Sequence, residues 1–239
     1  MNLKHDNPAG RLLTILKEGK NFPAHNTCID AWFKILKTDN HTDMFCRLGT
    51  LMQLIKDTAS IVLEEFPDEV EAVGHWSGQL KTAFIHYTLQ GQWISFTQHI
   101  DTHSLNYLAS ESKLLNLKSN TKSVIDTDIQ TIRNKLSSIY DEVLSNDIDL
   151  EVKKYLIRYL RKILTGIDDY FLTGALPILE AVETAVGHVY IDKKYKTFLM
   201  DTEFGKKILD TLAATANVVT VAVGLPQLTT AIAMIAGNA

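Results

Sequence analysis

Between residues 153 and 162 the sequence gathers cationic and aromatic side chains that could bind phosphates and bases. These residues are Lys153, Lys154, Tyr155, Arg158, Tyr159, Arg161 and Lys162. On a helix, cations at this spacing can pair with phosphate oxygens, and the interleaved tyrosines can stack on bases. The segment therefore predicts a site for a nucleotide or a single-stranded oligonucleotide. In the alternative, Glu142, Asp149 and Glu151 neutralise the cations and the face is merely solvated.

Two histidines raise the question of a metal site. His99 and His103 are four residues apart, so both imidazoles would share one face of a helix. Two ligands do not close a tetrahedral zinc site, and the sequence names no third or fourth. The pair Asp168 and Asp169 is more typical of a solvated helix end than of acid–base catalysis. We therefore expect no bound metal.

The chain lacks the motifs of the common enzyme classes. It has no glycine-rich phosphate loop, no nucleophile elbow, no paired-cysteine zinc site and no helical zinc-protease motif. Its two cysteines, Cys28 and Cys46, fit ordinary buried thiols in a reducing compartment. The sequence predicts neither catalysis nor a cofactor.

Net charge and the N-terminal residues bear on partners and location. A formal net charge of −4 and a pI of about 6.1 give no basic field, so we expect no generic binding to duplex DNA. Residues 1–8 lack the apolar core of a secretory signal, so we expect a cytoplasmic protein.

Apolar residues recur at three- and four-residue spacing along nearly the whole chain, which predicts an all-α fold built as a multi-helix bundle. Asn7 and Pro8 are typical of a helix cap followed by proline at the first helical position. A long core helix is expected over residues 44–66. Two glycines favour a kink or two short helices within residues 70–88, and a further helical pattern covers residues 93–117.

The second half of the chain shows longer and more regular patterns. Residues 128–144 and 150–172 predict an antiparallel helical hairpin, and residues 176–186 predict another helix. Residues 189–200 are expected to form a loop with some extended structure. The polar residues 118–127 are the best candidate for an internal linker.

The C-terminal segment is the most distinctive part of the sequence, because no ionisable side chain follows Asp210. As one helix, Leu212 to Ile235 would span about 36 Å, more than the ~30 Å hydrocarbon core of a bilayer. Its polar positions share a stripe that could face water or partner helices inside a pore. The stripe consists of Asn217, Thr220, Gly224 and Gln227. The sequence thus divides into a helical body, 1–205, and an apolar segment, 206–239.

Gly224 and Pro226 favour a different geometry for the same segment. Two short helices could meet there at a turn and form a helical hairpin buried in a soluble core. Proline is also tolerated in membrane helices, so the sequence leaves open whether the segment inserts or stays buried.

Three features together resemble a group of uncharacterised bacterial all-helical proteins: the opening Asn7-Pro8-Ala9-Gly10-Arg11-Leu12, the run from Ile167 to Gly174, and the apolar tail. In architecture the chain also resembles membrane-active effectors of bacterial antiphage defence, such as the Hailong type. The resemblance implies a homo-oligomer whose tail permeabilises the inner membrane, as an ion channel, when an inhibitory partner or a nucleotide or oligonucleotide ligand no longer inhibits it. The rival hypothesis is a soluble all-helical scaffold or protein-interaction module with a buried C-terminal hairpin.

Overall fold

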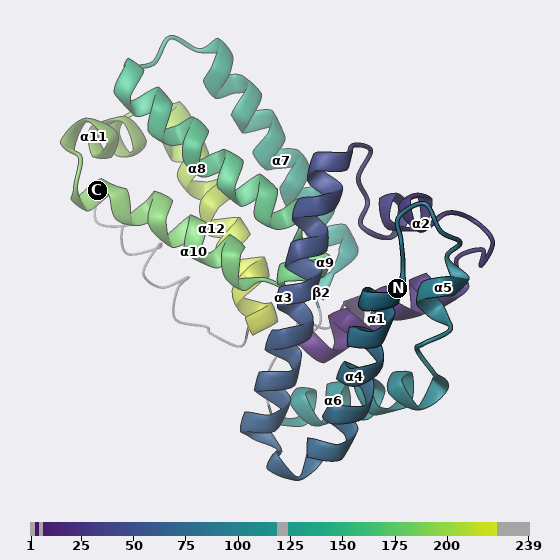
Figure 1. Ribbon diagram of the computed structural model, residues 1–239. Coiled ribbons are helices and arrows are strands. Elements are labelled where there is room, and N and C mark those ends of the chain that lie inside the picture. Colours follow the sequence, from purple (N-terminus) through teal and green to yellow (C-terminus); the bar gives the residue numbers. More distant parts are fainter. Residues whose placement is uncertain (1–2, 5–6, 119–123, 224–239) are drawn as a thin grey trace. The chain divides into compact units, whose positions relative to one another are not determined.

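The computed structural model describes residues 3–4, 7–118 and 124–223, which form two compact units (Figure 1). Residues 7–118 make the N-terminal unit, and the remaining described residues make the C-terminal unit. The boundary falls at residues 119–120, within the polar segment 118–127 that the sequence marks as a linker.

Helices supply nearly all the regular structure, which confirms the predicted all-α class. Within the described ranges the strands are β1 (Leu3–Lys4) and β2 (Val124–Ile125), two residues each, paired antiparallel. None of the helices in the described part of the chain is both long enough and apolar enough to cross a bilayer.

The N-terminal unit begins where the sequence predicts a helix cap. Its elements are α1 (Pro8–Asn21), α2 (Cys28–Ile35), α3 (His41–Glu65), the short 3-10 helix η1 (Pro67–Glu69), α4 (Val70–His86), α5 (Ile94–Thr97) and α6 (Thr102–Lys118). The Asn7 side chain accepts a hydrogen bond from Gly10 N at 2.6 Å, which confirms the cap. The Asn7 amide also donates to Asn116 Oδ1 at 2.6 Å, so the same residue ties α1 to α6.

Three predictions for this unit need correction. Cys46, expected to be a buried thiol, is exposed, whereas Cys28 is buried as expected. The alternative of two short helices in residues 70–88 is wrong, because α4 is one continuous helix. Its glycines lower helix propensity, but burial of Trp76 and Leu80 stabilises the helix through tertiary packing. The pattern over 93–117 is divided between α5 and α6, and Asp101 accepts a hydrogen bond from Ser104 N at 2.8 Å in the first turn of α6.

Aromatic rings fill the core of the N-terminal unit. Trp32 contacts Trp93 and Phe96 with ring centroids 4.9 and 5.0 Å apart. Trp93 Nε1 donates to Gly19 O at 2.7 Å, and a Cβ at residue 19 would lie only 3.2 Å from the Trp93 ring. Glycine there lets α1 approach the indole closely.

The C-terminal unit is an antiparallel four-helix bundle with shorter helices at its connections. Its helices are α7 (Asp126–Ser145), α8 (Leu150–Asp168), α9 (Tyr170–Thr173), α10 (Leu176–Gly187), the 3-10 helix η2 (His188–Tyr190), α11 (Lys193–Asp201) and α12 (Glu203–Val223). The long helices contact in the cycle α7–α8–α10–α12–α7 (Figure 1). Each connection reverses the chain, as in an up-down-up-down bundle.

Two side-chain contacts between α7 and α8 establish the antiparallel order of these helices. Arg133 Nε, in the first half of α7, donates to Asp168 Oδ1, at the end of α8, at 2.6 Å. Further along, Arg161 donates to the Tyr140 hydroxyl at 2.9 Å. The predicted hairpin of residues 128–144 and 150–172 is therefore confirmed.

The predicted loop at residues 189–200 is wrong, because all of these residues except 191 and 192 belong to η2 or α11. Asp192 caps α11 by accepting a hydrogen bond from Tyr195 N at 3.0 Å. Tyr195 and Leu199, four residues apart, are both fully buried. Two apolar positions four residues apart did not suffice to predict a helix from the sequence, because lysines and residues typical of strands surround them.

α12 runs without a break through the boundary proposed at residues 205–206. Its buried side chains include Leu212, Ala216 and Val219, and it packs against α7 and α10. The described first part of the apolar segment is thus a member of the bundle core. The rest of the segment, 224–239, lies outside the described residues.

A carboxyl group is buried in the N-terminal unit. Glu111 is fully buried, and its Oε1 accepts a hydrogen bond from Trp76 Nε1 at 3.0 Å. Its Oε2 has no hydrogen-bond partner among the described residues. Burial disfavours the carboxylate and is the main reason that the pKa of Glu111 is raised to about 7. The hydrogen bond from Trp76 lowers this pKa, whereas the negative charge of Glu69 raises it further.

This raised pKa predicts a pH-dependent stability of the N-terminal unit. The ordinary glutamate pKa is 4.5, so the stabilising effect of a neutral Glu111 is complete below that pH and is lost as pH rises to about 7. Glu111→Gln should flatten this fall and raise the free energy of unfolding at pH 8, by on the order of 1 kcal/mol. All three tryptophans lie in this unit, so urea unfolding followed by tryptophan fluorescence isolates the effect.

The exposed residue Glu64 on α3 provides the control, since Glu64→Gln should leave the pH profile unchanged. Identical pH profiles for the wild type and Glu111→Gln would contradict the prediction.

Candidate functional site

A groove of about 720 Å³ runs between α8 and α10 of the C-terminal unit. Its polar lining on α8 includes Lys154, Arg158, Arg161 and Lys162. These are four of the seven residues that the sequence predicts as a binding site. On the opposite side, α10 contributes Pro177, Ala181 and Thr184, as well as Glu180.

The amphipathic pattern of α8 places the cations on the groove side. Leu156, Leu160 and Ile163 are buried in the bundle core, whereas Arg158 and Lys162 are exposed. Apolar residues at three- and four-residue spacing fix one face of the helix to the core, so the cations between them must face outward. The local sequence therefore determines which side chains reach the groove.

The floor of the groove depends on a close approach of two helices. A Cβ atom on Gly166 would lie 3.0 Å from Ile178 Cγ1 and 3.4 Å from Ile178 N. Glycine allows α8 and α10 to contact at this point, while the longer side chains of Lys154 and Arg158 line the groove further along. The sequence alone did not identify the α10 side, because its lining residues form no recognisable motif.

The groove cations are largely free of acidic partners. In the described part of the chain, Lys154, Arg158 and Lys162 form no ion pair with a carboxylate. Arg161 donates to the Tyr140 hydroxyl rather than to a carboxylate. A groove lined by unneutralised cations attracts anions.

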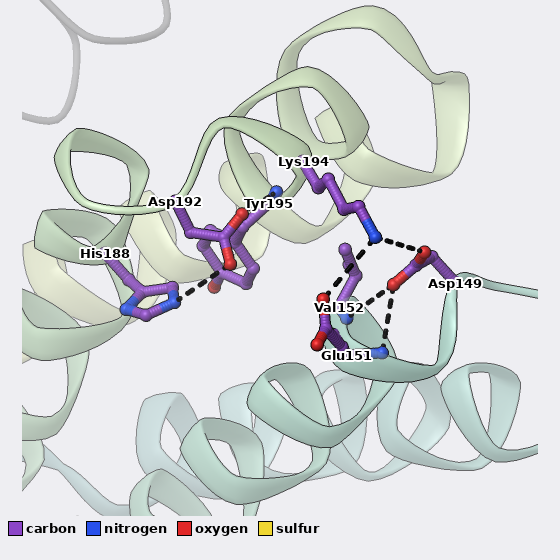
Figure 2. A network of polar contacts seen from close by, with 7 residues as sticks. All are labelled: Asp149, Glu151, Val152, His188, Asp192, Lys194 and Tyr195. Carbon is purple, nitrogen blue, oxygen red and sulfur yellow. Dashed lines mark hydrogen bonds and ion pairs between the residues drawn. The ribbon is translucent and has the colours of Figure 1, made fainter.

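The carboxylates that could have neutralised this patch are engaged elsewhere. Lys207 donates to both oxygens of Glu142, at 2.6 and 2.8 Å, and this hydrogen bonding lowers the pKa of Glu142. Figure 2 shows Lys194 between Asp149 and Glu151, with its Nζ 3.2 and 3.4 Å from their carboxylate oxygens. Lysines of α11 and α12 thus pair with the acidic residues near α8.

Three of the seven predicted binding residues do not line the groove. Lys153 donates to the backbone oxygens of Leu144 and Asn146 at 2.7 and 3.0 Å, at the end of α7. Tyr159 is buried, and Tyr155 packs on the ring of His188 with centroids 4.1 Å apart. The tyrosines therefore stack within the protein and do not provide the groove with a surface for bases.

The cluster around Tyr155 contains polar atoms without hydrogen-bond partners. The Tyr195 hydroxyl and His188 Nε2 are both buried and unpartnered within the described residues. His188 Nε2 lies 4.0 Å from Asp192 Oδ2 (Figure 2), too far for a hydrogen bond. Burial raises the pKa of Tyr195 and keeps the phenol neutral. These rings hold α8, η2 and α11 together.

The histidines do not assemble the site considered from the sequence. His99 lies between α5 and α6, whereas His103 lies in α6, so they do not share one helix face. Their rings lie next to different histidines. The ring centroids of His99 and His86 are 5.6 Å apart, and those of His103 and His75 are 6.5 Å apart. Asp101 Oδ2 lies 3.0 Å from His75 Nε2. Across the described ranges no three histidine, cysteine or acidic side chains could hold a metal ion.

The proposed pore stripe falls partly in α12. Asn217 is exposed, but Thr220 is buried and its hydroxyl donates to Asn217 O at 3.2 Å. The hydroxyl of Thr220 is therefore satisfied by its own helix. Gly224 and Gln227 lie outside the described residues, so the complete stripe stays a prediction.

No family model matches the chain, and no match was found among curated proteins or among solved structures. What the groove can do follows from its own residues. Lys154, Arg158 and Lys162 can donate to anionic oxygens, and the hydroxyl of Thr165 can add a neutral hydrogen bond. The Thr184 hydroxyl donates to Glu180 O at 2.7 Å, so it can only accept from a ligand. A volume of about 720 Å³ falls within the ~300–1,000 Å³ typical of small-molecule sites.

The contact at Gly166 predicts that even one added methyl group disturbs the groove. Gly166→Ala should destabilise the protein by on the order of 1 kcal/mol, because the new Cβ would push α10 away at Ile178. Gly187→Ala is the matched control, since a Cβ there would meet nothing within 4 Å. Urea unfolding followed by circular dichroism measures both. The prediction fails if the two variants are equally stable.

Proposed function

We propose that the C-terminal unit binds a phosphate-bearing ligand in the groove between α8 and α10. The observation that carries this proposal is the set of groove cations without acidic partners, Lys154, Arg158 and Lys162. Unneutralised cations on a packed helix repel one another, and a bound anion relieves this repulsion. The ligand class is a nucleotide or a short oligonucleotide, bound mainly through its phosphates.

The packing of the groove helices suggests how binding could act on the rest of the unit. α10 lines the groove on one side and packs against α12 on the other. A ligand that bridges α8 and α10 stabilises the arrangement in which α12 is held, by mass action. The proposal assigns the chain a binding and regulatory role and no catalytic step.

Removing the groove cations should abolish anion binding without unfolding the chain. We expect the triple variant Lys154→Gln, Arg158→Gln, Lys162→Gln to bind tripolyphosphate at least about tenfold more weakly than the wild type at low salt, because each lost cation removes a charge-assisted hydrogen bond. Calorimetric titration measures the affinity. The wild-type affinity should also fall steeply with added salt.

The matched control removes the same charge from the same unit away from the groove. Lys193→Gln, Lys196→Gln and Lys206→Gln together should leave the affinity nearly unchanged, because none of these residues lines the groove. Equal weakening in both triple variants would mean that net charge, and not the groove, attracts the anion. In that case the proposal is wrong.

A second function follows if binding controls the apolar segment. α12 contains the start of the charge-free stretch after Asp210, and its buried face is covered by α7 and α10. Release of α12 from the bundle would expose that face to water, and self-association or insertion into the inner membrane would bury it again. The chain would then be a cytoplasmic, defence-type effector that oligomerises and permeabilises the membrane when its ligand is lost.

The packing of α12 decides where a truncation can test this second function. A chain ending at Asp210 would lack core residues such as Leu212 and Val219 and would not fold normally. A chain ending at Val223 keeps the described bundle. We expect the full chain, expressed in bacteria, to lower the signal of a membrane-potential dye, and the chain ending at Val223 to have no such effect.

If both chains fold and neither changes the membrane potential under any trigger tested, the result would favour the rival scaffold hypothesis. Circular dichroism of the shortened chain must match the full chain in helical signal, so that loss of activity is not mistaken for unfolding.

A further inference from the structure

The groove between α8 and α10 is polarised along its length. Its cations occupy positions 154–162 of α8, about 12 Å along the helix axis. The lining then continues to Asp169, about a further 10 Å, without another cation among the described residues. Two carboxylates line the groove, that of Asp169 and that of Glu180 on α10. One part of the groove is therefore cationic, and the other carries negative charge.

Two contacts align α10 with α8 and place Glu180 along the groove. Tyr155 packs on His188 at one end, and Gly166 meets Ile178 at the other. Because the helices are antiparallel, Glu180 lies opposite the α8 residues between Lys162 and Gly166. It stands where the cationic part ends. Glu180 forms no ion pair with a described cation.

The cationic part selects an extended anion. Lys154, Arg158 and Lys162 succeed one another at intervals of four residues, about 6 Å each. A single phosphate cannot reach all three, whereas a chain of linked phosphates can contact successive cations. Beyond Lys162 the carboxylate of Glu180 repels further phosphates, which disfavours a long polynucleotide running through the groove.

The remaining part of the groove suits a neutral group with hydrogen-bond donors. A carboxylate accepts hydrogen bonds only, so Glu180 favours hydroxyl or amino donors such as those of a ribose or a base. Pro177 and Ala181 supply apolar lining against which the faces of a sugar or base can pack. A ligand that is anionic at one end and donor-rich at the other matches both parts.

Building on the proposed function, we infer that the groove takes a ribonucleoside polyphosphate. Its phosphate chain lies along Lys154, Arg158 and Lys162, and its nucleoside lies beside Glu180. Glu180 makes the groove bind nucleotides in preference to inorganic polyphosphate, because its carboxylate attracts hydrogen-bond donors and repels phosphate.

Calorimetric titrations of the full chain test this with the four common ribonucleoside triphosphates, inorganic tripolyphosphate and a twelve-nucleotide single strand. At least one triphosphate should bind about tenfold more tightly than tripolyphosphate, as expected for a hydrogen bond to a charged group. The single strand should bind more weakly than that triphosphate. Glu180→Gln should reduce the preference for triphosphate over tripolyphosphate severalfold, partly by improving the binding of tripolyphosphate.

Glu183→Gln is the matched control, because Glu183 is an exposed carboxylate of α10 that does not line the groove. The preference should be unchanged in that variant. If tripolyphosphate binds as tightly as every nucleotide, or if Glu180→Gln keeps the preference, the inference is overturned while anion binding stands. Tighter binding of the single strand also overturns it. If none of the probes binds, the proposed function falls with it.

Discussion

Burial of α12 between α7 and α10 is the interaction on which the C-terminal unit depends. A helical hairpin of α7 and α8 with α10 beside it leaves one side of the core uncovered, and Leu212, Ala216 and Val219 close it. Apolar burial of this kind is the main favourable term in folding. The segment that is most unusual in sequence is therefore, in its described part, also what completes the bundle. Any activity in which α12 leaves the bundle must offset the free energy that is lost when this core opens.

The position of α10 follows from that closure. It touches α12 on its buried face and faces the groove with Glu180 and Thr184, so one helix belongs to both the core and the site. Packed interiors transmit displacement because they are dense and deform little. The close contact of Gly166 with Ile178 makes the distance between α8 and α10 sensitive to small changes. This geometry is the physical basis for coupling a ligand in the groove to α12.

Distribution of charge gives the groove its character. The unit has acidic residues next to α8, but Lys194 and Lys207 on α11 and α12 bind them. Such exposed ion pairs contribute little to stability. Their consequence here is electrostatic, since they occupy Glu142, Asp149 and Glu151, which could otherwise pair with the cations of α8. The N-terminal unit shows the opposite case, in which Glu111 is buried with one hydrogen-bond donor and its pKa rises toward neutrality.

The sequence by itself determined the helical class, the Asn7 cap, the hairpin of α7 and α8, and the outward direction of Arg158 and Lys162. These follow from local rules, because apolar spacing sets the buried face of a helix and capping chemistry sets its start. Only the tertiary structure decided that α10 supplies the other wall of the groove, that Tyr155 stacks on His188, and that Glu142 pairs with Lys207. It also decided that residues 193–201 are helical, where Asp192 and two buried side chains outweigh a sequence that resembles a strand. Lys207 and Glu142 are 65 residues apart in the sequence, and no local pattern records which distant side chain packing will bring within reach.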